Sequence, residues 1–145
     1  MAELQIASPV LQRVYRDWQD RRKGSALPSR RSFDVLDLKY VLGYVNLLDV
    51  LRAPLRFRYR VHGTHCVALL GYDMTGKFVD DYPDDAYRAR VSEKFTQVVE
   101  TRSPSCDRGE REIVDGRRIG FEALILPLAA DGETVDMLMV ALSLA

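Results

Sequence analysis

The spacing of apolar residues changes several times along this chain, and this change constrains the fold more than any other feature of the sequence. Residues 8–24 follow the 3.6-residue period of a helix, whereas residues 44–61 form an apolar run and an alternating segment that are typical of strands. Residues 64–70 and 84–101 return to helical spacing on either side of an irregular loop, and residues 105–144 alternate again. The order predicts an α+β domain with five antiparallel strands in one sheet, helices on one face of it, and an N-terminal flanking helix.

The turn residues between these segments give approximate boundaries for each element. We expect strands at residues 44–51, 55–61, 105–114, 117–128 and 134–144. We expect helices between Ser8 and Gly24 and at residues 34–42, 64–70 and 84–101. Residues 25–33 carry the turn formers of a linker, so residues 1–26 are predicted to be a helical extension and residues 27–145 the main domain.

The N-terminal helix is amphipathic, with an aromatic-rich apolar face. Its apolar residues are Val10, Leu11, Val14, Tyr15 and Trp18. A helix of about 15 residues is marginal alone in water, so this face must find a partner surface. We expect it to pack either on the sheet of its own chain or on a second copy of the chain, as a dimer helix.

Charge and cysteine content exclude several classes of function. The 145 residues contain 21 Lys plus Arg and 21 Asp plus Glu, so a general polyanion binder is disfavoured and we expect no nucleic-acid partner. No apolar run reaches the roughly 18 residues that a membrane span requires, and the start of the chain lacks the pattern of a signal peptide. Cys66 and Cys106 form neither a disulfide framework nor a metal motif. We expect reduced thiols and a cytoplasmic protein.

Three stretches of the sequence resemble one family of signalling domains. They are LPSRRSFDVLDLKYVLGYVNLLDV (27–50), RFRYRVHGTHCVALLGYDMTGK (56–77) and FEALILPLAADGETVDML (121–138). Their order and the long helix between them resemble the divergent stand-alone PAS domains of alphaproteobacteria. The resemblance implies a PAS-like curved sheet whose inner face and helices enclose a small pocket, used to sense a ligand or to dock a partner protein. PAS domains of this kind often dimerise through a flanking helix.

A pocket in that position would be lined by apolar residues of the inner sheet face and of the helix faces turned toward it. The expected lining is Tyr59, Val61, His65, Leu69, Tyr72, Phe78, Tyr87, Val91, Phe95 and Phe121. Arg88 also falls inside the apolar arc of the long helix. If Asp84 or Asp85 pairs with it, Arg88 is structural and the ligand is neutral; otherwise Arg88 would bind a carboxylate or phosphate.

The better-known cofactors of PAS domains can be compared with these residues. Haem usually requires a histidine on the long helix, and residues 84–101 contain none. A photochemical flavin requires a cysteine in an Asn-Cys-Arg-Phe context, and neither cysteine has those neighbours. His62 ends a predicted strand and Gly63 separates this strand from the helix of His65, so the two histidines are not expected to form a metal site. We therefore expect no cofactor and no metal.

The PAS resemblance implies a non-enzymatic sensor or adaptor, which is the leading hypothesis, and the sequence lacks the common catalytic motifs. With about 25 residues before the PAS-like region and none to spare after it, its signal is expected to pass to another protein. An alternative is a small isomerase- or thioesterase-like enzyme with an acid or histidine deep in its cavity. A third is an interaction module with a filled core.

Glu122 interrupts an apolar strand and is either a buried acid or the partner of a strand arginine such as Arg58 or Arg118.

Overall fold

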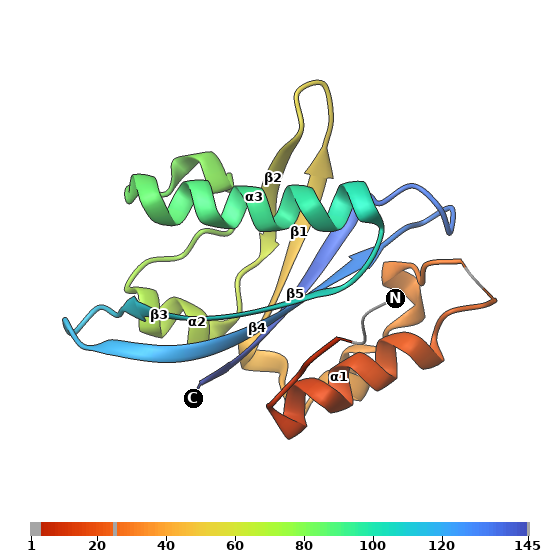
Figure 1. Ribbon diagram of the computed structural model, residues 1–145, viewed down its shortest axis with the longest axis horizontal. Coiled ribbons are helices and arrows are strands. Elements are labelled where there is room, and N and C mark those ends of the chain that lie inside the picture. The colour runs from red at the N-terminus through yellow and green to blue at the C-terminus, as the bar shows by residue number, and fades with distance from the viewer. Residues whose placement is uncertain (1–3, 25, 145) are drawn as a thin grey trace.

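The computed structural model describes residues 4–24 and 26–144 and contains one five-stranded antiparallel sheet (Figure 1). The strands are β1 (Val45–Leu51), β2 (Arg56–Val61), β3 (Ser105–Glu112), β4 (Arg118–Leu128) and β5 (Met137–Leu144). They lie in the order β2-β1-β5-β4-β3, so the C-terminal strand occupies the centre of the sheet. The predicted α+β architecture and its five antiparallel strands are confirmed.

The α-helices also follow the prediction, apart from the second one. They are α1 (Pro9–Asp20), α2 (Thr64–Leu70) and α3 (Asp85–Thr101). Four single 3-10 turns connect them: η1 (Arg30–Ser32), η2 (Val35–Leu38), η3 (Leu42–Tyr44) and η4 (Val79–Asp81). The helix predicted at residues 34–42 is wrong, because the backbone leaves the helical region at Val41, where φ is −133°. Buried Leu38 and Val41 still anchor this segment to the core.

Helices cover both faces of the sheet. α3 crosses the inner face (Figure 1), which carries Ile125 and its cross-strand partner Val140. α1 contacts β4 and β5 from the outer face, where Leu124 and Leu126 are fully buried. Successive residues of a strand point to opposite faces, so the cavity side and the α1 side of β4 and β5 are separated by a single layer of backbone.

The apolar face of α1 packs on the sheet of its own chain, the first of the two predicted alternatives. Leu11 and Val14 are 0% exposed, and the Trp18 indole N–H donates to the carbonyl of Pro127 at 3.0 Å. Tyr15 is half-buried and stacks on Trp18, whereas Val10 is 41% exposed. The helix starts as predicted, because the Ser8 side chain accepts the Leu11 N–H.

Candidate functional site

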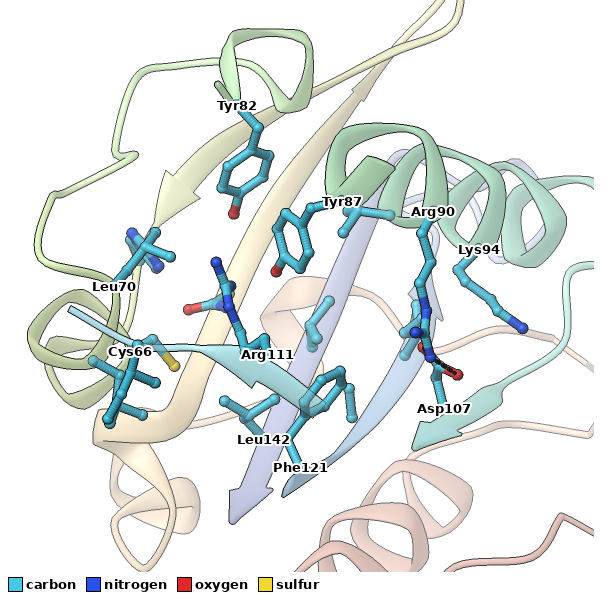
Figure 2. A pocket seen from close by; sticks show the side chains of 18 of the residues that line it. Cys66, Leu70, Tyr82, Tyr87, Arg90, Lys94, Asp107, Arg111, Phe121 and Leu142 are labelled. Atoms are coloured by element: carbon cyan, nitrogen blue, oxygen red, sulfur yellow. Dashed lines mark hydrogen bonds and ion pairs between the residues drawn. The ribbon is translucent and has the colours of Figure 1, made fainter. Parts of the chain in front are cut away.

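A partly enclosed cavity of about 120 Å³ lies between the inner face of the sheet and helices α2 and α3 (Figure 2). Most of its wall is apolar. The apolar side chains include Leu69, Leu70, Val91, Phe95, Ile113, Ile119, Phe121, Ile125, Val140 and Leu142. Its volume is close to that of an engineered cavity of about 150 Å³ that holds benzene. The space therefore matches a molecule of about one ring.

Six of the eleven residues predicted for the pocket line this cavity. They are Tyr59, Leu69, Tyr87, Val91, Phe95 and Phe121. They come from the predicted inner faces of β2 and β4 and from the predicted arcs of α2 and α3. The 2.0- and 3.6-residue periods of the sequence indicate the faces of Tyr59 and of the α3 residues, whereas residues 117–128 are apolar on both faces and their alternation does not specify the direction of Phe121.

Val61 lies outside the cavity and is 43% exposed. The register between β1 and β2 shifts at this point: Leu48 pairs with Tyr59, but Leu47 pairs with Val61. This bulge inserts one extra residue into β2, and an insertion of one residue exchanges the faces of everything that follows. The next residue, His62, consequently points into the cavity in place of Val61.

His65 also lies outside the cavity, on the side of α2 that faces the start of β1. It stacks on Tyr44 with ring centroids 4.7 Å apart. Its imidazole lies so close to Gly43 that a Cβ there would come within 2.0 Å of the ring. Cys66 takes the cavity position on this first turn of α2.

Tyr72 and Phe78, from the loop after α2, are separated from the cavity as well. Tyr72 lines an open surface groove beside it, together with Arg111. Phe78 packs beneath the Arg56 guanidinium, 3.7 Å from the ring centre, at the edge of β2. Loop residues have no periodicity that fixes their direction, so the sequence could not separate these two aromatics from the pocket.

Arg88 points away from the cavity and is paired within the chain. Its guanidinium donates to the Asp85 carboxylate and to the carbonyl of Tyr82. Asp84 has a different task, because its side chain accepts the Tyr87 N–H as the N-cap of α3. Arg88 is thus structural, the outcome that its spacing from Asp85 favoured.

The polar wall of the cavity contains groups that hold protons at neutral pH. The hydroxyls of Tyr59 and Tyr82 are hydrogen bonded at 2.5 Å, and burial raises the pKa of both phenols. Burial likewise raises the pKa of the Cys66 thiol to about 11. Burial lowers the pKa of His62, whose Nδ1 accepts the Met74 N–H at 3.0 Å. His62 is therefore a neutral imidazole with its proton on Nε2.

Arg111 of β3 also reaches this polar wall, and the sequence reasoning missed it. Figure 2 shows its side chain extending toward the hydroxyl ends of Tyr82 and Tyr87. Its guanidinium carbon lies 4.0 Å from the centre of the Tyr87 ring. Alternation along β3 would have placed Arg111 on the inner face with Gly109, so the signal was present in the sequence.

Glu122, on the outer face of β4, is buried and ionised, and its partner is Arg108 rather than Arg58 or Arg118. Burial alone would raise the pKa of Glu122. The N–H groups of Ala7 and Ser8, each at 2.8 Å, and the Arg108 guanidinium at 2.9 Å outweigh that effect and lower the pKa. The carboxylate thereby fastens the start of α1 to the sheet.

Two kinds of site are absent from the part of the chain that the structure describes, residues 4–24 and 26–144. None of its helices is long and apolar enough to cross a membrane. Within the same residues, no three His, Cys, Asp or Glu side chains are grouped closely enough to hold a metal ion.

Solved structures with the same fold are similar to this chain at low sequence identity. VqmA bound to DPO has a TM-score of 0.60 and 14% identity, over 76% of this chain and 56% of that one. A light-oxygen-voltage domain studied with a flavin analogue has a TM-score of 0.56 and 15% identity, over 76% and 82% of the two chains. A sensory box sensor histidine kinase from Vibrio cholerae has a TM-score of 0.52 and 15% identity, over 76% and 90%. These likenesses show the fold.

The family comparison covers nearly the whole chain. No curated protein matches the sequence. The chain spans about half the length of VqmA, the first of these structures. A family described as PAS domain matches residues 6–143, which include α1 as well as the sheet. This chain therefore belongs to the PAS domain family.

Proposed function

We propose that this protein is a sensor domain that binds a small molecule in the cavity between the sheet and α3 and passes the signal to a partner protein. PAS domains are typically sensor domains and not enzymes. The observation that carries the proposal is the cavity itself, an apolar space of about 120 Å³ with a few inward polar groups. Such a combination is typical of small-molecule sites. VqmA, which has the same fold, was solved with a bound ligand.

The signal would leave the domain through its N-terminal side. In this proposal residues 1–26 act as the extension that carries the signal, and residues 27–145 bind the ligand. Phe121 and Ala123 line the cavity, and Glu122 between them holds Ala7 and Ser8 from the other face. A ligand that displaces β4 would act directly on the start of α1.

The chemistry of the cavity favours binding over catalysis. A general base must be poised near the working pH, and a nucleophilic thiol must be ionised. His62 has one ring nitrogen occupied by the Met74 N–H, and the pKa of Cys66 is raised to about 11 by burial. These properties support a sensor rather than the isomerase- or thioesterase-like alternative.

The size of the cavity also bears on cofactors. It matches about one ring, so the three fused rings of a flavin and the macrocycle of haem would each exceed it. We therefore propose that neither is the physiological ligand, although light-oxygen-voltage domains share the fold.

We further propose a cytoplasmic location and a protein partner. Cys66 and Cys106 are both free thiols, which supports a reducing compartment. The partner would be a second copy of this chain, as a homodimer, or another signalling protein. Light scattering of the full chain tests the first case, and a monomer at micromolar concentration would exclude it there.

Native mass spectrometry of the purified protein tests the ligand proposal. We expect a small adduct that Val91→Trp removes, because the indole would extend from α3 into the cavity. Gln97→Trp places the same side chain on the exposed face of α3 and should keep the adduct. A wild-type spectrum without adduct, combined with no binding from a panel of one-ring compounds, would reject the proposal.

A further inference from the structure

Arg111 differs from the other cations that line the cavity. Among the described residues, it is the one that points inward and forms no ion pair with a carboxylate. It is half-buried on β3, and its guanidinium faces the Tyr87 ring and the Tyr72 hydroxyl, two neutral groups. None of the ion pairs found within residues 4–24 and 26–144 includes Arg111. The guanidinium of Arg111 therefore forms no direct ion pair with a carboxylate of these residues, although Asp84, Glu110 and Glu112 line the same open groove.

The other cations of the cavity wall differ from Arg111 in this respect. Arg90 is bound by both oxygens of Asp107 at 3.1 Å. Lys94 points away from the cavity (Figure 2). Glu110 also borders the cavity, but it precedes Arg111 directly on β3 and is exposed, so their side chains leave opposite faces of the strand. Within residues 4–24 and 26–144, Arg111 is thus the cation of the cavity wall that points inward without a carboxylate partner.

A guanidinium in this position is suited to one kind of ligand group. Partial burial removes water from the charge, and that cost is offset only when an anion or several acceptors take the place of the water. A planar carboxylate matches the guanidinium fork through two parallel hydrogen bonds. The cation–π contact with the Tyr87 ring, 4.0 Å from the guanidinium carbon to the ring centre, restrains the position of the guanidinium before any ligand arrives.

The rest of the cavity determines what the carboxylate is attached to. Arg111 lines both the cavity and the open groove beside it, so it stands where the apolar interior meets water. Most of the remaining wall is apolar, with side chains such as Val91, Phe95 and Ile125, and it leaves room for about one ring. A ligand with its charged end at Arg111 would place a flat apolar body between α3 and the sheet.

We infer that the cavity binds a small monocarboxylate with an apolar body of about one ring, and that Arg111 is its counter-ion. This inference rests on the proposed sensor function and names its ligand class. It also replaces the expectation that a satisfied Arg88 implies a neutral ligand, because the charge at the site comes from β3 and not from α3.

Isothermal titration calorimetry with benzoate and its neutral analogue benzamide tests the inference at pH 7. We expect the wild-type protein to bind benzoate more tightly than benzamide. Arg111→Met should weaken benzoate binding by about tenfold or more and change benzamide binding little, since only the charge-assisted hydrogen bonds are lost. Arg111→Lys keeps the charge without the fork and should fall between wild type and Arg111→Met. It also supplies the test if Arg111→Met does not fold.

Arg117→Met is the matched control. Arg117 lies in the turn between β3 and β4, is paired with Asp115 at 2.8 Å, and does not line the cavity. This variant removes the same charge and should leave benzoate binding unchanged. Benzamide that binds as tightly as benzoate, or benzoate binding that survives Arg111→Met, would overturn the carboxylate inference and leave the sensor proposal intact. Failure of both compounds to bind would also overturn the inference, and native mass spectrometry would then decide the sensor proposal separately.

Discussion

Among single residues, Glu122 combines deep burial with the largest number of charge-assisted contacts described above. It is 6% exposed and accepts hydrogen bonds from Ala7, Ser8 and Arg108. Glu122→Gln keeps the shape of the side chain but replaces one acceptor oxygen with an NH₂ group. This group would face N–H donors of the surrounding residues. We expect a loss of about 1–3 kcal/mol in the free energy of unfolding at pH 7, measured by urea denaturation. Glu100→Gln, at an exposed position of α3, should stay within about 0.5 kcal/mol of wild type.

The difference in unfolding free energy between wild type and Glu122→Gln should depend on pH, and the direction of this dependence follows from the pKa of Glu122. The pKa of Glu122 is lowered in the folded state, so the folded protein binds fewer protons than the unfolded chain near that pKa. Its contribution is fully present above the ordinary pKa of a glutamate and is lost as the pH falls through the lower folded-state pKa. The stability difference between wild type and Glu122→Gln should therefore be constant from pH 6 to 8 and shrink below about pH 4.5. A difference that grows on acidification would contradict this assignment.

The sequence could predict which residues line the cavity only where the strand or helix period continues without interruption. Tyr59 follows unbroken strand spacing and Val91 unbroken helix spacing, and both line the cavity. Phe121 also lines it, although its strand is apolar on both faces and its direction was open. The prediction was wrong at Val61, because a bulge depends on how β1 and β2 pair and leaves no mark in the sequence of β2 alone. Arg111 was missed for another reason: its strand is short of apolar residues, so its inner face did not stand out.

At the scale of elements, α1 packs on the sheet through a narrow row of buried side chains, Leu11, Val14 and Trp18. Leu11 is 0% exposed in that row, whereas its neighbour Val10 is 41% exposed. Leu11→Ala should cost about 2–5 kcal/mol in thermal or urea unfolding, because it leaves a void between α1 and the sheet. Val10→Ala is the matched control and should cost well under 1 kcal/mol. Equal losses would mean that α1 does not pack on this sheet in solution.

The elements themselves were largely predictable, since amphipathic periods and caps extend over many residues. α2 ends as its glycine suggested, with Gly71 at φ +91°. The segment at residues 34–42 was not predictable. Among its residues whose burial is described, Leu38 and Val41 are buried and Leu36 and Leu42 are exposed, so they do not form a continuous buried helical face. Which face α1 would cover was also open, because an apolar stripe does not specify its partner.

In the whole molecule, the cavity and α1 lie on opposite faces of the same two central strands. Ile125 and Val140 line the cavity, while Leu124 and Ala141 beside them lie on the outer face and are fully buried. A change in the spacing or twist of β4 and β5 would therefore reach both surfaces at once. In the proposed function, the signal could therefore pass from the cavity to α1 through β4 and β5 without the movement of any other element.

Hydrogen exchange can show whether that route operates. A ligand at about a hundredfold its Kd adds about 2.7 kcal/mol to the stability of the folded state. Amides of β4 and β5 that open only by global unfolding should then exchange about a hundredfold more slowly with saturating benzoate. If the cavity and α1 are coupled, the amides of α1 should slow as well, although no α1 residue lines the cavity. Val91→Trp should abolish both effects. Slowing in the strands with unchanged exchange in α1 would show that α1 detaches independently of the cavity, and the signal would have to leave the domain by another surface.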